Sequence, residues 1–135
     1  MNKKTLIVLS VVIVVIVIIS ITNYDQLDEK LVASKIQVSA IYFDDRKVIE
    51  ITYNDKSNMT NFVTLEIEGL TNSFHKKYSG SSFVEDIPLS QTPQYGWKTL
   101  PVTFLVEHKE FGQVLLKIEI SQAGQQPSKV IYGRT

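Results

Sequence analysis

One uncharged stretch near the start of the chain constrains its structure more than any other feature. Residues 5–24 contain no charged side chain, and residues 6–21 are apolar apart from Ser10 and Ser20. Twenty residues at a rise of about 1.5 Å per residue give a helix of roughly 30 Å, the thickness of one hydrocarbon core. The sequence therefore predicts a transmembrane helix over residues 5–24.

The charges that flank this stretch predict its orientation. Lys3 and Lys4 precede it, whereas Asp25, Asp28 and Glu29 follow it. Because basic residues stay on the cytoplasmic side, residues 1–4 are expected in the cytoplasm and the rest of the chain outside it. The expected location is the cell membrane, crossed once, with lipid contacted through the helix.

A cleaved signal peptide is the alternative interpretation of the same stretch. Signal peptides have an apolar region of 7–15 residues that ends in small residues of the Ala-x-Ala kind. Here the apolar run is longer, and the pair at the required offset, Ser20 and Thr22, fits that pattern poorly. A retained signal-anchor is therefore favoured over cleavage.

Composition excludes several classes of function for the remainder. The 135 residues carry 14 basic and 14 acidic side chains, and subtracting Lys3 and Lys4 leaves 12 basic against 14 acidic. Nucleic-acid binding, which needs a basic excess, is not expected. The chain has no cysteine and two histidines, so neither a metal centre nor another cofactor is expected. No nucleophile or phosphate-binding motif occurs, and the chain is not expected to be an enzyme.

After the membrane segment, residues 25–34 are predicted to form a juxtamembrane linker or stalk. Leu27, Leu31 and Val32 are spaced for one helical face there. From residue 35 the pattern changes to strand-like alternation, which continues between turn-forming clusters to the end of the chain. Residues 35–135 are therefore predicted to form one extracytoplasmic domain, with strands near residues 36–42, 49–53, 63–67, 74–78, 83–87, 102–106, 114–120 and 129–132.

Short alternating strands without an internal helical pattern predict an all-β fold, an antiparallel sandwich of about seven strands, with a small open barrel as the alternative. The segments at 74–78 and 83–87 are short and polar, as edge strands are, and the hairpin over 102–120 is expected to be central. This pattern, over residues 35–132, resembles an immunoglobulin-like or fibronectin type III-like sandwich. The resemblance implies a role in adhesion or scaffolding.

The longest loop, residues 88–101, contains the best candidate for a protein contact. Tyr95 and Trp97 lie there between prolines, and exposed aromatic side chains on loops commonly anchor interfaces. Trp97 has a second interpretation, in which its bulk folds back as a plug over one end of the sandwich. Both interpretations stay open at this point.

The functional interpretations of the other polar residues are weaker. Asn58-Met59-Thr60 matches the N-glycosylation motif and lies in a predicted turn. Asp44-Asp45 and residues 54–58 offer oxygen ligands for calcium, although turn hydrogen bonding explains them better. His75 and His108 are expected on the solvated surface.

The leading functional hypothesis is a membrane-anchored extracytoplasmic interaction or structural module with an unidentified protein partner, such as an accessory subunit of an envelope complex. The order of parts also resembles that of archaeal type IV pilins and archaellins, where a short basic leader precedes an apolar helix and a β-rich head. That resemblance implies a filament subunit. An anchored solute- or metal-binding domain is the third hypothesis.

Overall fold

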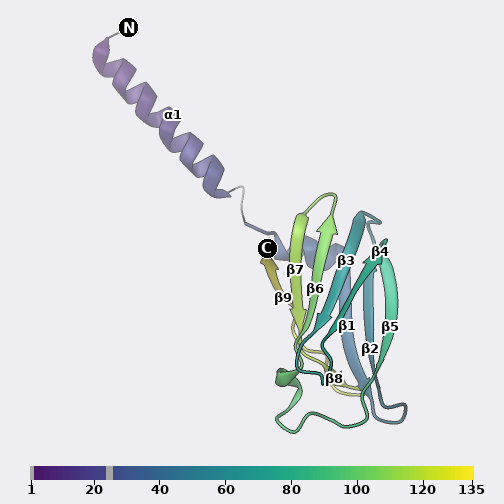
Figure 1. Cartoon of the computed structure of the whole chain (residues 1–135). Helices are drawn as coiled ribbons and strands as arrows, with labels where there is room; N and C mark the ends of the chain where they lie inside the picture. Colours follow the sequence, from purple (N-terminus) through teal and green to yellow (C-terminus); the bar gives the residue numbers. More distant parts are fainter. Residues whose placement is uncertain (1, 24–25) are drawn as a thin grey trace.

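The computed structural model describes residues 2–23 and 26–135; Asp25 and the last residue of the predicted membrane segment lie outside the description, as do the side chains of residues 19–23. The first element is a helix, α1 (Lys3–Asn23) (Figure 1). The described side chains of residues 2–18 are all exposed, and twelve of them are large and apolar. Over the residues that are described, no helix combines the length and the apolar character required to cross a membrane.

A second, short helix covers most of the segment predicted as a linker or stalk. Residues 26–28 are not helical, and α2 spans Glu29–Lys35. Asp28 caps α2, because its carboxylate accepts a hydrogen bond of 3.1 Å from the Leu31 backbone N–H. Val32 is fully buried in the core of the β-domain, so α2 packs against the sandwich as part of it.

The rest of the described chain forms two sheets that pack face to face as a β-sandwich (Figure 1). The first sheet has the order β5-β2-β1-β8, in which β1–β2 and β2–β5 are antiparallel and β8 is parallel to β1. Its strands are β1 (Ile36–Phe43), β2 (Val48–Asp55), β5 (Ser82–Pro88) and β8 (Ser121–Gln122).

The second sheet is antiparallel throughout and has the order β4-β3-β6-β7-β9. Its strands are β3 (Thr60–Ile67), β4 (Phe74–Ser79), β6 (Val102–His108), β7 (Gly112–Ile118) and β9 (Ile131–Arg134). The predicted hairpin is central, since β6 lies in the middle of this sheet. One turn of 3₁₀ helix, η1 (Trp97–Thr99), interrupts the long connection between β5 and β6.

The core follows from the alternation seen in the sequence. Successive side chains of a strand point to opposite faces, so every second residue of β2 and β3 lies between the sheets. Ile51, Leu65 and Phe104 are fully buried there. Each such side chain contributes about 1.5–3 kcal/mol relative to exposure, which makes this interior the main source of stability.

The strands predicted to be edges are edges, and they join the two sheets. The Tyr78 ring on β4 stacks on Phe83 of β5 with a centroid distance of 3.8 Å. The Tyr78 hydroxyl donates to Glu85 at 2.5 Å, and Lys76 lies 3.0 Å from the same carboxylate. These bonds from Tyr78 and Lys76 hold the pKa of Glu85 below its usual range, against the opposing effect of burial. The contacts close this side of the sandwich.

Two details at the end of the chain differ from the expectation. The last strand lies at Ile131–Arg134, two residues beyond the predicted position, because its pairing with β7 sets its register. The two-residue strand β8 was not predicted, since two residues carry no periodic pattern.

Candidate functional site

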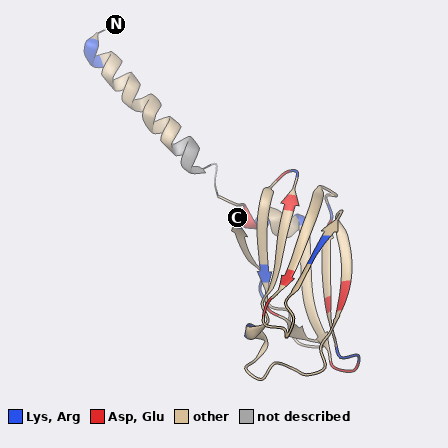
Figure 2. Ribbon diagram, in the orientation of Figure 1, with Lys and Arg blue, Asp and Glu red and all other residues tan. Residues whose placement is uncertain are grey.

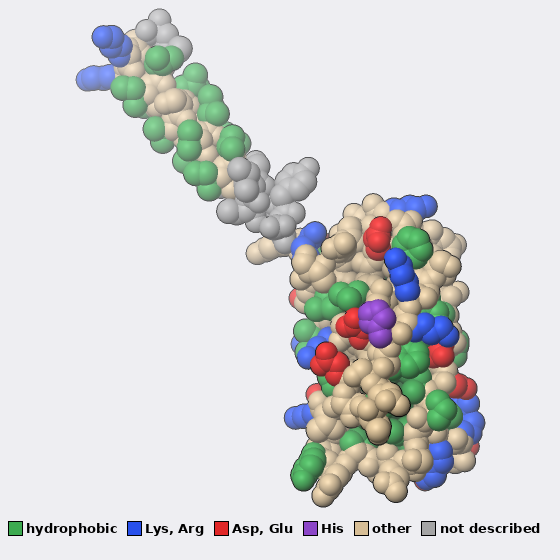
Figure 3. Space-filling model, viewed as in Figure 1, with side chains coloured by type: hydrophobic (Ala, Val, Ile, Leu, Met, Phe, Trp, Pro, Cys, Tyr) green, Lys and Arg blue, Asp and Glu red, His purple; other side chains and the backbone are tan. Residues whose placement is uncertain are grey.

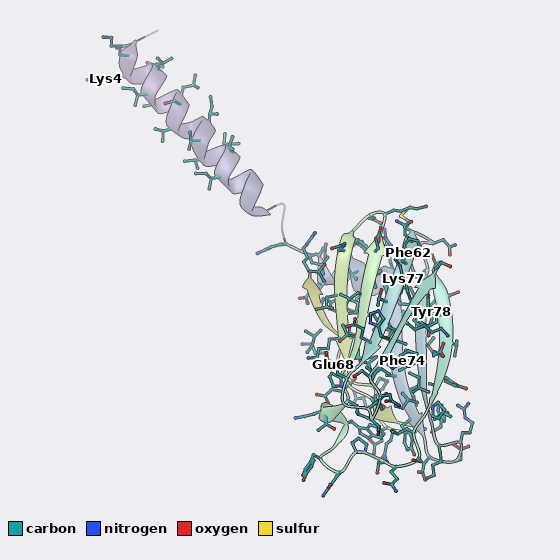
Figure 4. All side chains as sticks on the ribbon, viewed as in Figure 1. Lys4, Phe62, Glu68, Phe74, Lys77 and Tyr78 are labelled. Atoms are coloured by element: carbon teal, nitrogen blue, oxygen red, sulfur yellow. The ribbon has the colours of Figure 1, made fainter. Side chains whose placement is uncertain are left out.

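The loops that follow β1, β3 and β5 meet at one end of the sandwich, opposite the end on which α2 packs (Figure 1). We call this the loop end. A depression of about 740 Å³ lies there, between the β3–β4 loop and the β5–β6 connection. Phe74, which lines it, and Glu68, which precedes the lining residue Gly69, are labelled in Figure 4. Pockets of about 300–1,000 Å³ are typical of small-molecule sites, so its size is sufficient to hold a ligand.

The structure separates the two aromatic residues that sequence analysis paired. Trp97 is half-buried and packs on Tyr42, with ring centroids 5.1 Å apart and planes inclined at 47°. Tyr95 is 82% exposed and lines the depression. Trp97 thus has the packing of a plug, whereas Tyr95 presents a whole ring to solvent. Whether either residue contacts a partner stays a prediction.

Several contacts fix the walls of the depression to the core. The Tyr42 hydroxyl donates to the Leu89 carbonyl at 3.3 Å, and the Thr99 hydroxyl donates to the Gly96 carbonyl at 2.8 Å. Gly69 has φ +86°, and a Cβ there would lie 2.2 Å from the Thr99 carbonyl oxygen. Only glycine permits that conformation and that approach together. The two loops therefore lie close together at this point.

The lining of the depression carries no charge. None of its sixteen residues is Asp, Glu, Lys, Arg or His, although 21% of the whole chain is charged. In Figure 2 the β5–β6 connection at the bottom of the molecule is almost entirely tan. Seven lining side chains are amides or hydroxyls: Thr71, Asn72, Ser73, Ser90, Gln91, Gln94 and Thr99. All seven are exposed and can act as donors or acceptors toward a ligand, except that the Thr99 hydroxyl already donates to the Gly96 carbonyl and can only accept.

A cluster of buried polar residues occupies the opposite end of the sandwich. Asp55 ends β2 and is 1% exposed, and both of its oxygens are used. One accepts from the Ser57 backbone N–H at 2.8 Å and from the Ser57 hydroxyl at 2.6 Å. The other accepts from the Met59 N–H at 3.0 Å and from the Thr60 hydroxyl at 2.8 Å. Asp55 thus performs the turn chemistry expected for residues 54–58.

These bonds determine the charge state of the cluster. Burial by itself would raise the pKa of Asp55, but the hydrogen bonds from Ser57, Thr60 and Met59 outweigh it and lower the pKa to about 2. Because the Thr60 proton goes to Asp55, the Tyr53 hydroxyl donates to Thr60 at 2.7 Å. Burial raises the pKa of Tyr53, and the negative charge of Asp55 adds to that effect.

His108 belongs to this cluster, and the expectation that it lies on the solvated surface is wrong. It is 2% exposed at the end of β6. Its Nδ1 accepts backbone N–H groups of Glu110 and Phe111 at 3.1 and 3.2 Å. Nε2 therefore carries the proton, 3.2 Å from both Asp55 and Ser57. The signal for this burial was present, since His108 continues the inward alternation of Val102, Phe104 and Val106.

The presence of Ser57, His108 and Asp55 together does not create an activated nucleophile. A general base must accept the serine proton through a free nitrogen lone pair. Here the Ser57 hydroxyl donates to Asp55, and both nitrogens of His108 are committed to other bonds. The cluster ties the β2–β3 turn to the β6–β7 hairpin and is best described as structural.

Asn58 lies at the exposed tip of the β2–β3 turn with φ 55°. Asparagine tolerates this left-handed conformation better than most residues, which gives Asn58 a conformational role. The hydroxyl of Thr60, the third residue of the glycosylation motif, is buried in the Asp55 cluster. Glycosylation of Asn58 stays a prediction, and it would require modification before this end of the domain has folded.

The remaining polar positions form surface contacts. His75 is exposed on β4, 2.9 Å from Glu66. Asp44 pairs with Lys47 at 2.5 Å, and this hydrogen bond holds the pKa of Asp44 below its ordinary value. Among residues 2–23 and 26–135, no three or more His, Cys, Asp or Glu side chains gather to form a metal site.

The outer face of the second sheet has a smaller hollow of about 290 Å³ beside Phe62 and Leu105. Lys77 lies over the Phe62 ring, 4.1 Å from its centroid, and Figure 4 shows the two on neighbouring strands. Mixed charges surround this face in Figure 3. On this face Lys77 covers the exposed Phe62 ring. Tyr95 at the loop end is 82% exposed.

No protein-family model matches this chain, and no curated protein or solved structure shows significant similarity to it.

Proposed function

We propose that the protein is a single-pass membrane protein with an extracytoplasmic immunoglobulin-like sandwich that binds a component of the cell envelope through its loop end. The observation that carries the binding role is Tyr95, fully presented on a loop that Trp97 and Gly69 hold in place. An exposed aromatic ring on a fixed loop adds contact area at little cost in conformational entropy. That combination is what recognition sites require.

The strand order supports the immunoglobulin-like assignment. Strands one, two and five of the domain share the first sheet, while three, six and seven share the second. Immunoglobulin sandwiches divide their A, B, E and C, F, G strands in the same way. In this chain the fourth strand joins the second sheet, and β8 and β9 extend the two edges.

Membrane attachment is supported by the uncharged run over residues 5–24 and by the exposed apolar side chains of α1. A helix that is apolar all round is stable when lipid or protein surrounds it. The loop end lies opposite α2, so an anchor that precedes α2 leaves the loop end directed away from the membrane.

Topology is tested with single cysteines, because the chain has none of its own. Asn2→Cys and Gln125→Cys variants are exposed in intact cells to a maleimide that cannot cross membranes. We expect Gln125→Cys to be labelled and Asn2→Cys to be labelled only after permeabilisation. The opposite pattern, or recovery of the protein in the soluble fraction, would overturn the proposal.

Binding is tested by solubilising native membranes and isolating whatever co-migrates with the full-length protein. We expect Tyr95→Ala to lose the co-migrating component. The control is Ile131→Ala, which removes a side chain that is 63% exposed on a different surface. Equal retention by both variants would contradict the assigned surface. A long homopolymer with a shortened N-terminus would instead establish a filament subunit.

A further inference from the structure

We propose that the ligand of the loop-end depression is an uncharged oligosaccharide. This inference rests on the proposed function and names the chemical class of ligand for the same surface. It is drawn from three properties of the depression: the absence of charge, the density of amide and hydroxyl groups, and the position of the Tyr95 ring.

The absence of charge selects a neutral ligand. At the chain-wide share of 21%, about three of the sixteen lining residues would be charged, and none is. A carboxylate, phosphate or ammonium group that entered the depression would lose water without gaining an opposite charge from any lining residue. Anionic polysaccharides, phosphopeptides and charged solutes are therefore disfavoured.

The polar side chains select a ligand rich in hydroxyl groups. Asn72, Gln91 and Gln94 each offer an amide donor and an acceptor, and four serine and threonine hydroxyls lie among them. They come from both walls, since residues 71–73 precede β4 and residues 90–99 follow β5. A sugar ring carries donors and acceptors around its whole circumference and can engage both walls together.

Tyr95 supplies the apolar half of such a site. One face of a sugar ring presents C–H groups, which carry partial positive charge and pack against the negative face of an aromatic ring. Tyr95 lies among the lining residues and is 82% exposed as a residue, whereas Phe74 is half-buried on the opposite wall. The volume of about 740 Å³ lies within the range of small-molecule sites.

The walls are fixed before any ligand arrives. The Tyr42–Leu89 hydrogen bond and the Trp97 packing join the β5–β6 connection to the core, and Leu70 and Phe74 pack the other wall against it. A pre-formed site does not lose binding free energy to loop ordering. This matters for a neutral ligand, which cannot offset such a cost with charge pairing.

The experiment measures binding of neutral hexasaccharides to the full-length protein by calorimetry, in nanodiscs or in a detergent without a sugar headgroup. Maltohexaose, cellohexaose and chitohexaose are the probes, and hexagalacturonate is the anionic comparison. We expect at least one neutral probe to bind and hexagalacturonate to bind at least about tenfold more weakly.

Variants assign the binding to the depression. Tyr95→Ala is expected to weaken it about tenfold, as loss of one aromatic contact does, while Tyr95→Trp retains it. Ile131→Ala is the matched control and is expected to bind like the wild type. Binding that survives Tyr95→Ala would overturn the assignment.

The outcomes separate this inference from the proposed function. Absence of binding by all three neutral probes at about 10 mM, well above a Kd of 1 mM, overturns the sugar ligand. If Tyr95→Ala still loses the native component in that case, the loop end binds a protein and the proposed function stands. If cysteine labelling places the loop end inside the cell, the proposed function fails whatever the sugars do.

Discussion

At the α2 end of the sandwich, Asp55, Thr60 and His108 turn inward and bond to one another, whereas at the loop end Asn72, Gln91 and Gln94 face solvent. The two ends belong to one fold, and both are built from short turns. A buried polar group needs a partner, and among the described residues no buried side-chain nitrogen or oxygen lacks one. Exposure leaves the polar groups of the loop end available to a ligand.

This difference shows how a small sandwich can separate stability from recognition. The α2 end joins the β2–β3 turn to the β6–β7 hairpin through side-chain bonds. At the loop end the backbone approaches closely at Gly69 and Trp97 packs on Tyr42, while Asn72, Gln91 and Gln94 stay exposed. Substitutions at the two ends are therefore expected to affect different properties.

The largest loss of stability is expected from Asp55→Ala. It removes the acceptor of four hydrogen bonds and leaves the Thr60 hydroxyl and the Nε2–H of His108 buried without that partner. Removal of one partner from a buried polar network costs about 3–5 kcal/mol in the free energy of unfolding. Urea denaturation measures it. Asp45→Ala, an exposed carboxylate in another turn, is the control and should cost less than about 0.5 kcal/mol.

The second-largest loss of stability is expected from Gly69→Ala at the loop end. The new Cβ meets the Thr99 carbonyl in a backbone conformation that alanine rarely adopts, and a loss of about 3 kcal/mol is expected. Gly80→Ala is the matched control, because Gly80 has φ +92° but nothing within 4 Å of the added Cβ. A loss of about 1 kcal/mol is expected there. Equal losses in thermal denaturation would show that the close approach of the loops contributes nothing.

The smallest loss of stability is expected when the pH is lowered. The pKa of Asp55 is about 2 in the folded protein and 3.8 for an ordinary aspartate, so folding favours the ionised form. The resulting stability is present above pH 4 and is lost as the pH falls toward 2, by about 2 kcal/mol. Urea midpoints measured from pH 6 to pH 2 detect this loss. Asp55→Asn cannot ionise, and its stability should fall less over the same range; a parallel fall would contradict the assigned carboxylate.

The strands could be predicted because each has its own alternation of apolar and polar residues. Ile49, Ile51 and Tyr53 mark β2, and Val63, Leu65 and Ile67 mark β3, before any tertiary contact is known. The same parity extends to Asp55 and His108, which could have been recognised as inward-facing. Asp55 was instead assigned to a turn and His108 to the solvated surface, because polar side chains at strand ends usually belong to exposed turns.

The loop-end site was predictable only in part. Tyr95 and Trp97 were nominated together from their place in a proline-containing loop. Their different roles depend on Tyr42, which lies 55 residues before Trp97 in the chain and contacts it across the fold. The opposite wall of the depression comes from the β3–β4 loop, which gave no functional signal of its own.

By itself, the sequence of this protein determined the position of the apolar segment, the β class of the domain and most of its strands, because hydropathy and alternation are local properties. Tertiary structure alone decided which strands share a sheet, which polar residues are buried and which loops face each other. Those features arise from contacts between residues distant in the chain, such as Asp55 with His108 and Gly69 with Thr99. Such contacts produce no periodic pattern in the sequence. The Asp55 cluster and the loop-end depression therefore appear only when the two sheets have packed.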